Sequence, residues 1–147
     1  MYNKLRGLIS GLVATVLVSI AIFIGHEFGI IPDLSILPEI EHSQYNPVGI
    51  PVLPAIGWAV HFFIGTLIWS FIFALFAGKG STYPARSHAL WFSVLMWIVL
   101  MAVLMPIAGH GLFGLQAGYS VPMIALLFHL AWAWTISFVY DLLPSAA

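Results

Sequence analysis

Four stretches of apolar residues, each long enough to cross a bilayer, constrain this sequence more than any other feature. A transmembrane helix needs about 20 apolar residues to span the hydrocarbon layer. The four stretches run over residues 7–31, 54–77, 88–108 and 119–143. The first has no charged residue before Glu27, and the second has none at all. The sequence therefore predicts an all-α membrane protein in which four transmembrane helices form a bundle.

The composition agrees with a membrane protein. Of the 147 residues, 62% are hydrophobic and 6% are charged, whereas a soluble domain carries about 25% charged residues. This excludes an ordinary soluble domain and a disordered chain. With only 4 Lys and Arg residues, the chain lacks the basic surface of a nucleic-acid-binding protein. The absence of Cys excludes disulfides, iron–sulfur clusters, thiolate zinc sites and a cysteine nucleophile.

The four spans fill most of the chain, so we expect a single transmembrane domain over residues 1–147. The first apolar stretch follows Lys4 and Arg6, as the core of a signal peptide would. However, a signal peptide has an apolar core of about 7–15 residues, which is much shorter than this stretch. We therefore expect an uncleaved first span.

The positions of the cations predict the orientation in the membrane. Lys4 and Arg6 precede the first span, and Lys79 and Arg86 lie between the second and third spans. Cytoplasmic segments carry the excess of Lys and Arg in membrane proteins. We therefore predict that both termini are cytoplasmic and that the longest connection, residues 32–53, lies outside.

The two helical hairpins resemble each other, which indicates an internal duplication. His61 and His129 each lie seven residues after a proline, Pro54 and Pro122. A small residue lies one turn to either side of each histidine, namely Gly57, Gly65, Ala125 and Ala133. Two hairpins of this kind would be parallel repeats about an axis along the membrane normal. Both histidines would then lie at the same depth, roughly 10 Å below the outer boundary at about 1.5 Å per residue.

Two histidines at one depth in the membrane are candidate ligands of a b-type haem. An ionisable residue in the apolar zone is by default a functional candidate, and imidazole is a usual axial ligand. In this interpretation His61 and His129 ligate the iron from facing helices. Gly57, Gly65, Ala125 and Ala133 would leave room for the porphyrin faces. The aromatic walls would be Trp58, Phe62, Phe63, Phe128 and Trp132.

A copper site is a second interpretation of the histidines. His26 and His110 end the first and third spans, and thioethers are available from Met101, Met105 and Met123. Soft sulfur ligands suit Cu(I).

Helix packing alone is a third interpretation. Small residues on one helix face allow transmembrane helices to approach closely, and Gly7, Gly11, Thr15 and Ser19 form such a stripe in the first span. A neutral His61 would then only form a hydrogen bond to a neighbouring helix. The sequence shows no H-E-x-x-H motif, catalytic triad or carboxylate pair, so we do not expect an enzyme.

Three segments resemble a known family. They are GLVAT at Gly11–Thr15, GWAVHFFIGTLIWSFIFAL at Gly57–Leu75 and MPIAGHGLFGL at Met105–Leu115. These segments are similar to an uncharacterised family of small prokaryotic four-span membrane proteins, known only as a domain of unknown function. The resemblance implies the four-span fold and a prokaryotic inner membrane. It implies no activity, cofactor or functional residue.

We expect the protein to be a non-catalytic accessory or structural subunit of a larger respiratory or photosynthetic membrane complex. The small polar portion, the small-residue helix faces and the lack of a catalytic motif favour this function. Its partners would be the lipid bilayer and other integral membrane subunits, or further copies of the chain, and no nucleic acid. Two alternatives stay open: a redox protein that carries haem b or copper, and a small transporter or channel lined by the paired histidines.

Overall fold

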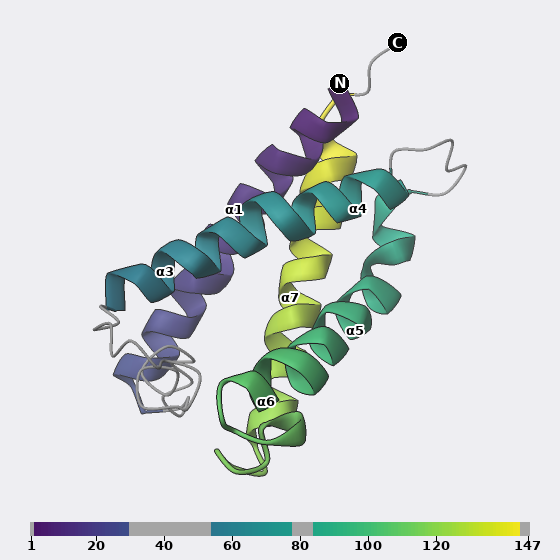
Figure 1. Cartoon of the computed structure of the whole chain (residues 1–147). Helices are drawn as coiled ribbons and strands as arrows, with labels where there is room; N and C mark the ends of the chain where they lie inside the picture. Colours follow the sequence, from purple (N-terminus) through teal and green to yellow (C-terminus); the bar gives the residue numbers. More distant parts are fainter. Residues whose placement is uncertain (1, 30–53, 78–83, 145–147) are drawn as a thin grey trace.

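The computed structural model describes residues 2–29, 54–77 and 84–144, whose regular structure is entirely helical (Figure 1). Four helices are long and apolar enough to cross a membrane: Asn3–Glu27, Trp58–Ala77, Ala85–Ile107 and Val121–Leu142. The predicted four-helix membrane fold is therefore confirmed. The outer connection of residues 32–53 and the Lys79 position lie outside the described residues.

The first and fourth spans are continuous α-helices. They are α1 (Tyr2–Glu27) and α7 (Val121–Leu142). Helix α1 begins before the predicted Gly7, because the polar segment with Lys4 and Arg6 continues the same helix. Helix α7 begins beside Pro122, whose missing N–H needs no partner in the first turn, as predicted.

The second and third spans each contain a π-helical segment. The second span consists of α3 (Pro54–Phe63), the π-helical η1 (Ile64–Trp69) and α4 (Ser70–Ala77). The third consists of the 3-10 turn η2 (Ala85–His88), α5 (Ala89–Val99), the π-helical η3 (Leu100–Leu104) and α6 (Met105–Ile107). Pro106 explains η3, because it offers no N–H to the Ala102 carbonyl and its ring crowds that group. The sequence patterns predicted neither of these π-helical segments.

A compact connection, residues 108–120, joins the third span to α7 and contains the 3-10 turn η4 (Leu112–Gly114). Phe113 has a φ of 58° and is the one non-glycine residue with positive φ in the described ranges. Its ring packs against Trp97, with the centroids 5.5 Å apart. The Trp97 indole N–H also donates to the Pro122 carbonyl at 2.8 Å. Trp97 thus holds a strained turn against the start of α7.

Both hairpins start at the same end of the bundle. The beginning of α1 and the end of α7 lie together at the top of Figure 1, and we call this the terminal end. The third span also starts there, because Asp141 of α7 contacts the backbone of η2. The two hairpins therefore run in the same direction, as a parallel repeat requires.

Helix α1 packs on the second span through small residues. A Cβ atom built on Gly7 would lie 2.6 Å from Ala74 Cβ, and one built on Gly11 would lie 2.5 Å from Ser70 Cβ. Both distances are shorter than any real carbon contact, so glycine is needed at both positions. The small-residue stripe of the first span thus serves close helix packing, as one interpretation predicted.

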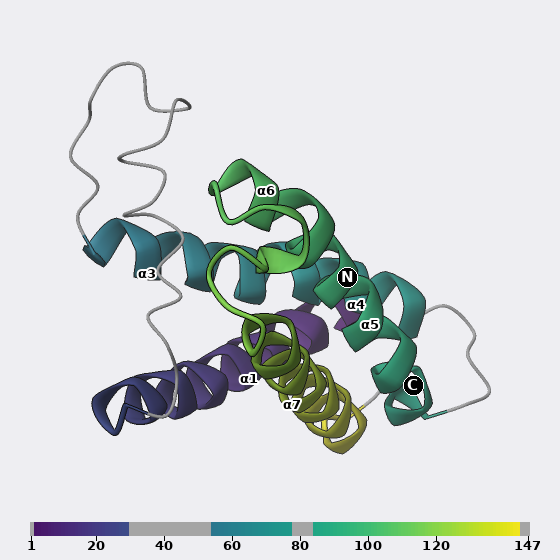
Figure 2. The same ribbon diagram turned by 90° about the horizontal axis from the view of Figure 1, so that it is seen from below.

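The apolar core is divided into two clusters. The larger cluster joins all four spans and consists of Ala14, Val18, Phe73, Ala74, Ala85, Ala89, Phe92, Met96, Trp132, Ala133, Ile136 and Tyr140. The smaller cluster joins only the third and fourth spans, through Met101, Met105 and Ala125. Toward the end opposite the termini, α1 and α3 diverge from α6 and from the start of α7 (Figures 1 and 2). The apolar cluster that joins all four spans therefore lies nearer the terminal end than the smaller cluster does.

Charged side chains connect the helices at the terminal end. The Arg6 guanidinium donates to the Tyr140 carbonyl at 2.6 Å and lies 4.2 Å from the centre of its ring. The Asp141 carboxylate accepts the backbone N–H groups of Ala85 at 2.8 Å and Arg86 at 3.3 Å. A cation at a helix C-terminus and an anion at an N-terminus are both stabilising. Asp141 is therefore a helix cap supplied by a neighbouring span.

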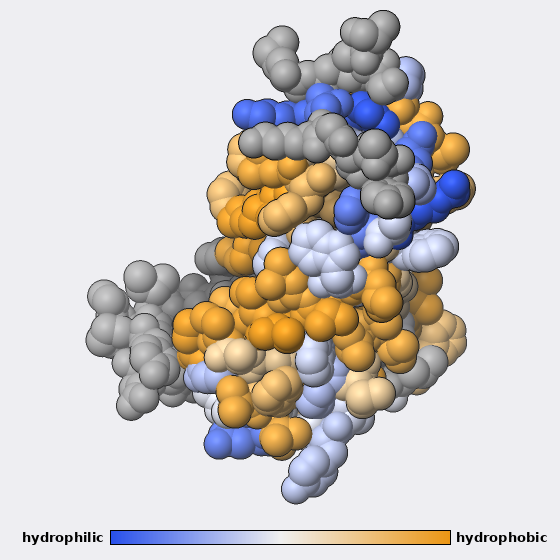
Figure 3. Space-filling view, turned by 90° about the vertical axis from the view of Figure 1, so that its right-hand side faces the viewer, coloured by the Kyte–Doolittle hydropathy of each residue, from blue (hydrophilic) through white to orange (hydrophobic). Residues whose placement is uncertain are grey.

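The surface has the distribution expected of a membrane protein. Figure 3 shows hydrophilic residues near the terminal end and a broad apolar band below them. Large hydrophobic side chains are exposed on all four spans. An exposed apolar surface of this extent is unusual for a soluble monomer but suits contact with lipid.

We expect Gly11→Ala to destabilise the bundle. The new methyl group would overlap Ser70, and rotation of the Ser70 hydroxyl would not relieve the 2.5 Å approach to its Cβ. Overpacking costs about 1–3 kcal/mol, which exceeds the roughly 1 kcal/mol by which alanine favours a helix over glycine. The unfolding midpoint in mixed micelles titrated with SDS measures the effect. Leu12→Ala is the control, because Leu12 is exposed on the same helix, and a midpoint of Gly11→Ala at or above wild type contradicts the packing.

We expect Asp141→Ala to lower the free energy of unfolding by about 1 kcal/mol, the usual value of a helix cap. Asp141→Asn should lose less, because the amide oxygen still accepts a backbone N–H. The same micelle titration measures both variants. Equal stability of Asp141→Ala and wild type would show that the cap contributes nothing.

Candidate functional site

The structure brings together the two histidines that the sequence pairs. His61 lies on α3 and His129 on α7, so the two come from different hairpins. Each lies seven residues after a proline near the start of its helix. His61 contacts Ser19 of α1, and Trp132, one turn after His129, contacts Thr15 one turn before Ser19, so both histidines lie at the same level of α1. Both side chains are partly buried. We call these two residues the histidine pair.

The hydrogen bond of His129 determines which ring nitrogen carries the proton. Its Nδ1 lies 2.7 Å from the Ala125 carbonyl oxygen. Because a carbonyl only accepts, Nδ1 must donate, and the neutral ring then has its lone pair on Nε2. This Nε2 has no hydrogen-bond partner in the part of the chain that the structure describes. His129 therefore offers one free acceptor.

His61 is held by a contact with the first span. Its Nε2 lies 3.1 Å from the hydroxyl of Ser19, which is buried on α1. The rings of Trp58 and Phe62 meet the imidazole edge to face, with centroids 5.8 Å and 5.9 Å away. Within the described ranges, Nδ1 of His61 has no hydrogen-bond partner.

A second polar contact lies one turn from the histidine pair. The indole N–H of Trp132 donates to the Thr15 hydroxyl at 3.0 Å, and both side chains are buried. Thr15 is one turn before Ser19 on α1, and Trp132 is one turn after His129 on α7. These residues, Thr15, Ser19, His61, His129 and Trp132, form a polar layer that joins α1, α3 and α7. It lies at the edge of the larger apolar cluster.

The small residues around the histidines are packed and do not flank an open space. A Cβ on Gly65 would lie 2.6 Å from the Thr15 hydroxyl. Ala125 and Ala133 are buried in the two apolar clusters. Room for a porphyrin at these positions stays a prediction, and Thr15 of α1 fills the space beside Gly65. The surroundings of Gly57 lie outside the described residues.

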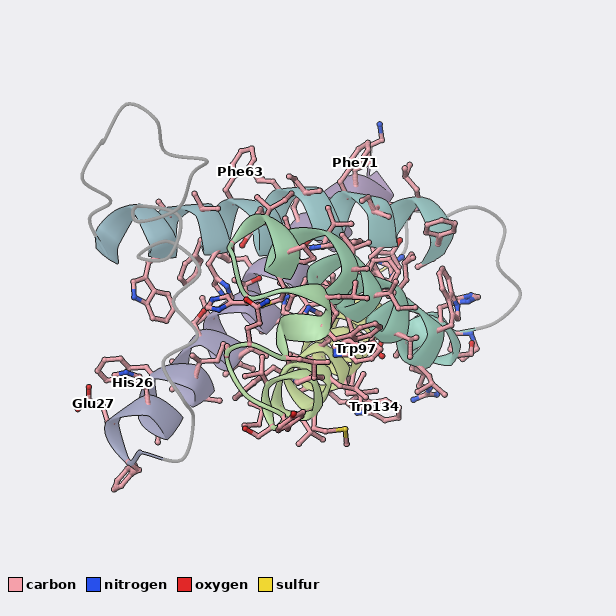
Figure 4. The ribbon with its side chains drawn as sticks, turned by 60° about the horizontal axis from the view of Figure 1, so that its bottom comes forward. His26, Glu27, Phe63, Phe71, Trp97 and Trp134 are labelled. Atoms are coloured by element: carbon pink, nitrogen blue, oxygen red, sulfur yellow. The ribbon has the colours of Figure 1, made fainter. Side chains whose placement is uncertain are left out.

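The hydrogen bonds of His129 suit a haem ligand better than those of His61 do. His129 has the usual arrangement of a metal ligand, with one ring N–H on a carbonyl and the other nitrogen free. His61 has its Nε2 on Ser19, so ligation through that atom would break the contact. Phe63, one of the predicted aromatic walls, is exposed and points away from the bundle (Figure 4). Haem ligation by this pair stays a prediction.

The residues of the predicted copper site are distributed over separate places. His26 is exposed at the end of α1 (Figure 4), which lies apart from α6 in both ribbon views. Met101 and Met105 are buried in the smaller cluster, and His110 is buried in the connection that follows. Within residues 2–29, 54–77 and 84–144, no three His, Asp or Glu side chains form a group that could hold a metal ion. His26 thus does not join the other three residues.

The sequence did not indicate which residues of the polar layer contact each other. The small-residue stripe indicated which face of the first span is buried, but not that Thr15 and Ser19 supply hydrogen bonds to Trp132 and His61. Nothing in the sequence indicated that Nε2 of His110 is buried with no hydrogen-bond partner among the described residues. The signal for Ser19 and Thr15 was present, since a buried hydroxyl in an apolar span needs a partner.

The chain belongs to a family of unknown function, DUF6789, whose model matches residues 1–147. This confirms the resemblance seen in the sequence, and it carries no activity, cofactor or ligand. No curated protein and no solved structure matches the chain. Function must therefore be argued from the residues themselves.

We expect Thr15→Val to destabilise the bundle by about 1–3 kcal/mol, because it leaves the Trp132 N–H buried without an acceptor. In the double variant with Trp132→Phe, that N–H is also gone, so the two losses should not add. A double-mutant cycle on the free energy of unfolding measures the coupling. A coupling energy near zero would mean that this hydrogen bond does not stabilise the protein.

Proposed function

We propose that the protein is a non-catalytic accessory or structural subunit of a larger membrane complex, respiratory or photosynthetic, in a prokaryotic inner membrane. Its termini would be cytoplasmic. Lys4, Arg6 and Arg86 all belong to the terminal end, which supports this orientation through the excess of cations on the cytoplasmic side.

The uneven burial of the spans is the observation that carries this proposal. In the most apolar window of each span, 39% of the first span is buried inside the protein but only 17% of the second. The second span meets α1 through Gly65, Ser70 and Ala74. Away from these contacts it exposes two aromatic side chains, Phe63 and Phe71. Figure 4 shows Phe63 and Phe71 pointing away from the bundle.

An aromatic helix face of this kind suits a neighbouring membrane subunit. Transmembrane helices associate through van der Waals packing, because lipid removes the hydrophobic driving force between them. Large flat side chains such as Trp and Phe are enriched in the cores of protein interfaces. A second span that is anchored on one side and aromatic on the other can connect this bundle to a partner.

A redox protein with haem or copper is the alternative. The free Nε2 of His129 favours it, whereas the Ser19 contact of His61 and the separation of His26 from the methionines weaken it. A reduced-minus-oxidised absorption spectrum with metal analysis tests this function directly. A small transporter or channel is supported only by the partial exposure of the histidine pair.

We expect the protein, extracted from its native membrane under gentle conditions, to migrate with other integral membrane polypeptides in a larger particle. The double variant Phe63→Ala and Phe71→Ala should lose these polypeptides, because it removes two aromatic contacts on the second span. The matched control is Trp134→Ala with Phe138→Ala, since both residues are exposed aromatics on α7. Native gel migration and mass spectrometry measure the outcome.

Two results would contradict this function. One is a monodisperse particle that contains this polypeptide alone. The other is a particle made only of several copies of this chain, which would make the protein a homo-oligomer with no larger complex.

A further inference from the structure

We propose that the histidine pair binds a neutral, membrane-soluble ligand of the hydroquinone class through its ring hydroxyls. This inference goes beyond the subunit function and does not depend on it. It rests on the partial exposure of both imidazoles, on their free ring nitrogen atoms, and on the absence of charged residues from the described helix segments around them.

The histidine pair lies at the edge of the larger apolar cluster. The larger cluster reaches Val18 and Trp132, which are one residue before Ser19 and three after His129. The smaller cluster, toward the other end, contains no residue of the first or second span among those described. At the level of the histidine pair the polar layer therefore joins the two hairpins, beside the partly buried Ile22 and Phe128 that pack against the larger cluster. Both imidazoles stay partly exposed at this level, so a ligand can reach them from the membrane.

The free nitrogen atoms select the chemistry of the ligand. Nε2 of His129 holds a lone pair, because Nδ1 donates to Ala125, and it accepts a hydrogen bond from a hydroxyl group. His61 keeps its contact with Ser19 through Nε2 and has Nδ1 left for a second partner. A hydroquinone carries two hydroxyls on opposite sides of one ring, so it can meet one imidazole from each hairpin. The oxidised quinone has only acceptors and finds no donor at His129 Nε2.

The surroundings favour an uncharged aromatic head group. Neither α3 nor the stretches 7–26 of α1 and 121–140 of α7 contain Asp, Glu, Lys or Arg. An ionic ligand would therefore lack a counter-charge and would be costly to bind at this depth. The Trp58 and Phe62 rings beside His61 offer aromatic edges to a flat ring. At roughly 10 Å below the membrane boundary, the tail of such a ligand remains in lipid.

Haem is the competing occupant of the same residues, and the observed contacts favour the hydroquinone. Haem ligation through Nε2 of His61 would displace the contact of that atom with Ser19. The space beside Gly65 is filled by Thr15, which removes one of the positions needed for a porphyrin face. A hydroquinone can bind while His61 keeps its contact with Ser19, and it needs no space beside Gly65.

The test compares decylubiquinol with its 1,4-dimethyl ether, which has the same ring and tail but no hydroxyl hydrogens. The purified full chain is placed in nanodiscs under anaerobic conditions, and quenching of tryptophan fluorescence gives the dissociation constant. We expect the quinol to bind about tenfold more tightly than the ether, as one or two neutral hydrogen bonds give. We also expect His129→Ala to weaken quinol binding about tenfold while leaving the ether unchanged.

The controls separate a binding role from a structural one. His26→Ala should bind both ligands like wild type, because His26 is exposed at the end of α1 and outside the polar layer. If His129→Ala does not fold, His61→Ala serves as the second variant, and the comparison of quinol with ether in the wild type still decides the question. Equal affinity for quinol and ether overturns the proposal. A Soret band that disappears in both histidine variants also overturns it, in favour of haem.

Discussion

The close approach of α1 to the second span is the contact on which the rest of the structure depends. Gly7 and Gly11 allow Ala74 and Ser70 to meet the α1 backbone, and Gly65 admits the side chain of Thr15. This approach fixes the rotation of α1 about its own axis. As a result, Ser19 faces His61 on one neighbour, and Thr15 faces Trp132 on the other. The polar layer is therefore a product of glycine packing, because a wider separation would leave these hydrogen bonds unmade in an apolar environment.

The sequence predicted those features that hydropathy and helix-end chemistry determine locally. The four spans follow from apolar length, and the starts of α3 and α7 follow from Pro54 and Pro122. The pairing of His61 with His129 followed from equal spacing after these prolines, and the contacts of α1 place both residues at the same level of that helix. Hydropathy and helix-end chemistry did not reveal which side chains on different helices contact each other. Whether His61 meets Ser19, or Asp141 meets Ala85, depends on how distant helices pack against each other.

The pattern of small residues around each histidine shows why the candidate site was only partly predictable. Glycine one turn from an imidazole is compatible with a porphyrin face and equally with a neighbouring helix. The difference at Gly65 is Thr15 of α1, some fifty residues away in sequence, which occupies the space. The π-helical η1 illustrates the same limit, because no proline or charge marks Ile64–Trp69 in the sequence. Only η3, which precedes Pro106, had a local signal.

The contact between Arg6 and Tyr140 has a consequence for biosynthesis. Of the four spans described, Arg6 lies on the one that leaves the ribosome first and Tyr140 on the one that leaves it last. The glycine-mediated contact between α1 and the second span can form as soon as the first hairpin is inserted. The acceptor for Arg6, the indole for Thr15 and the carboxylate that caps η2 all arrive only with α7. Maturation is thus a late docking step, and a nascent chain halted before α7 would display unmatched polar groups to the insertion machinery.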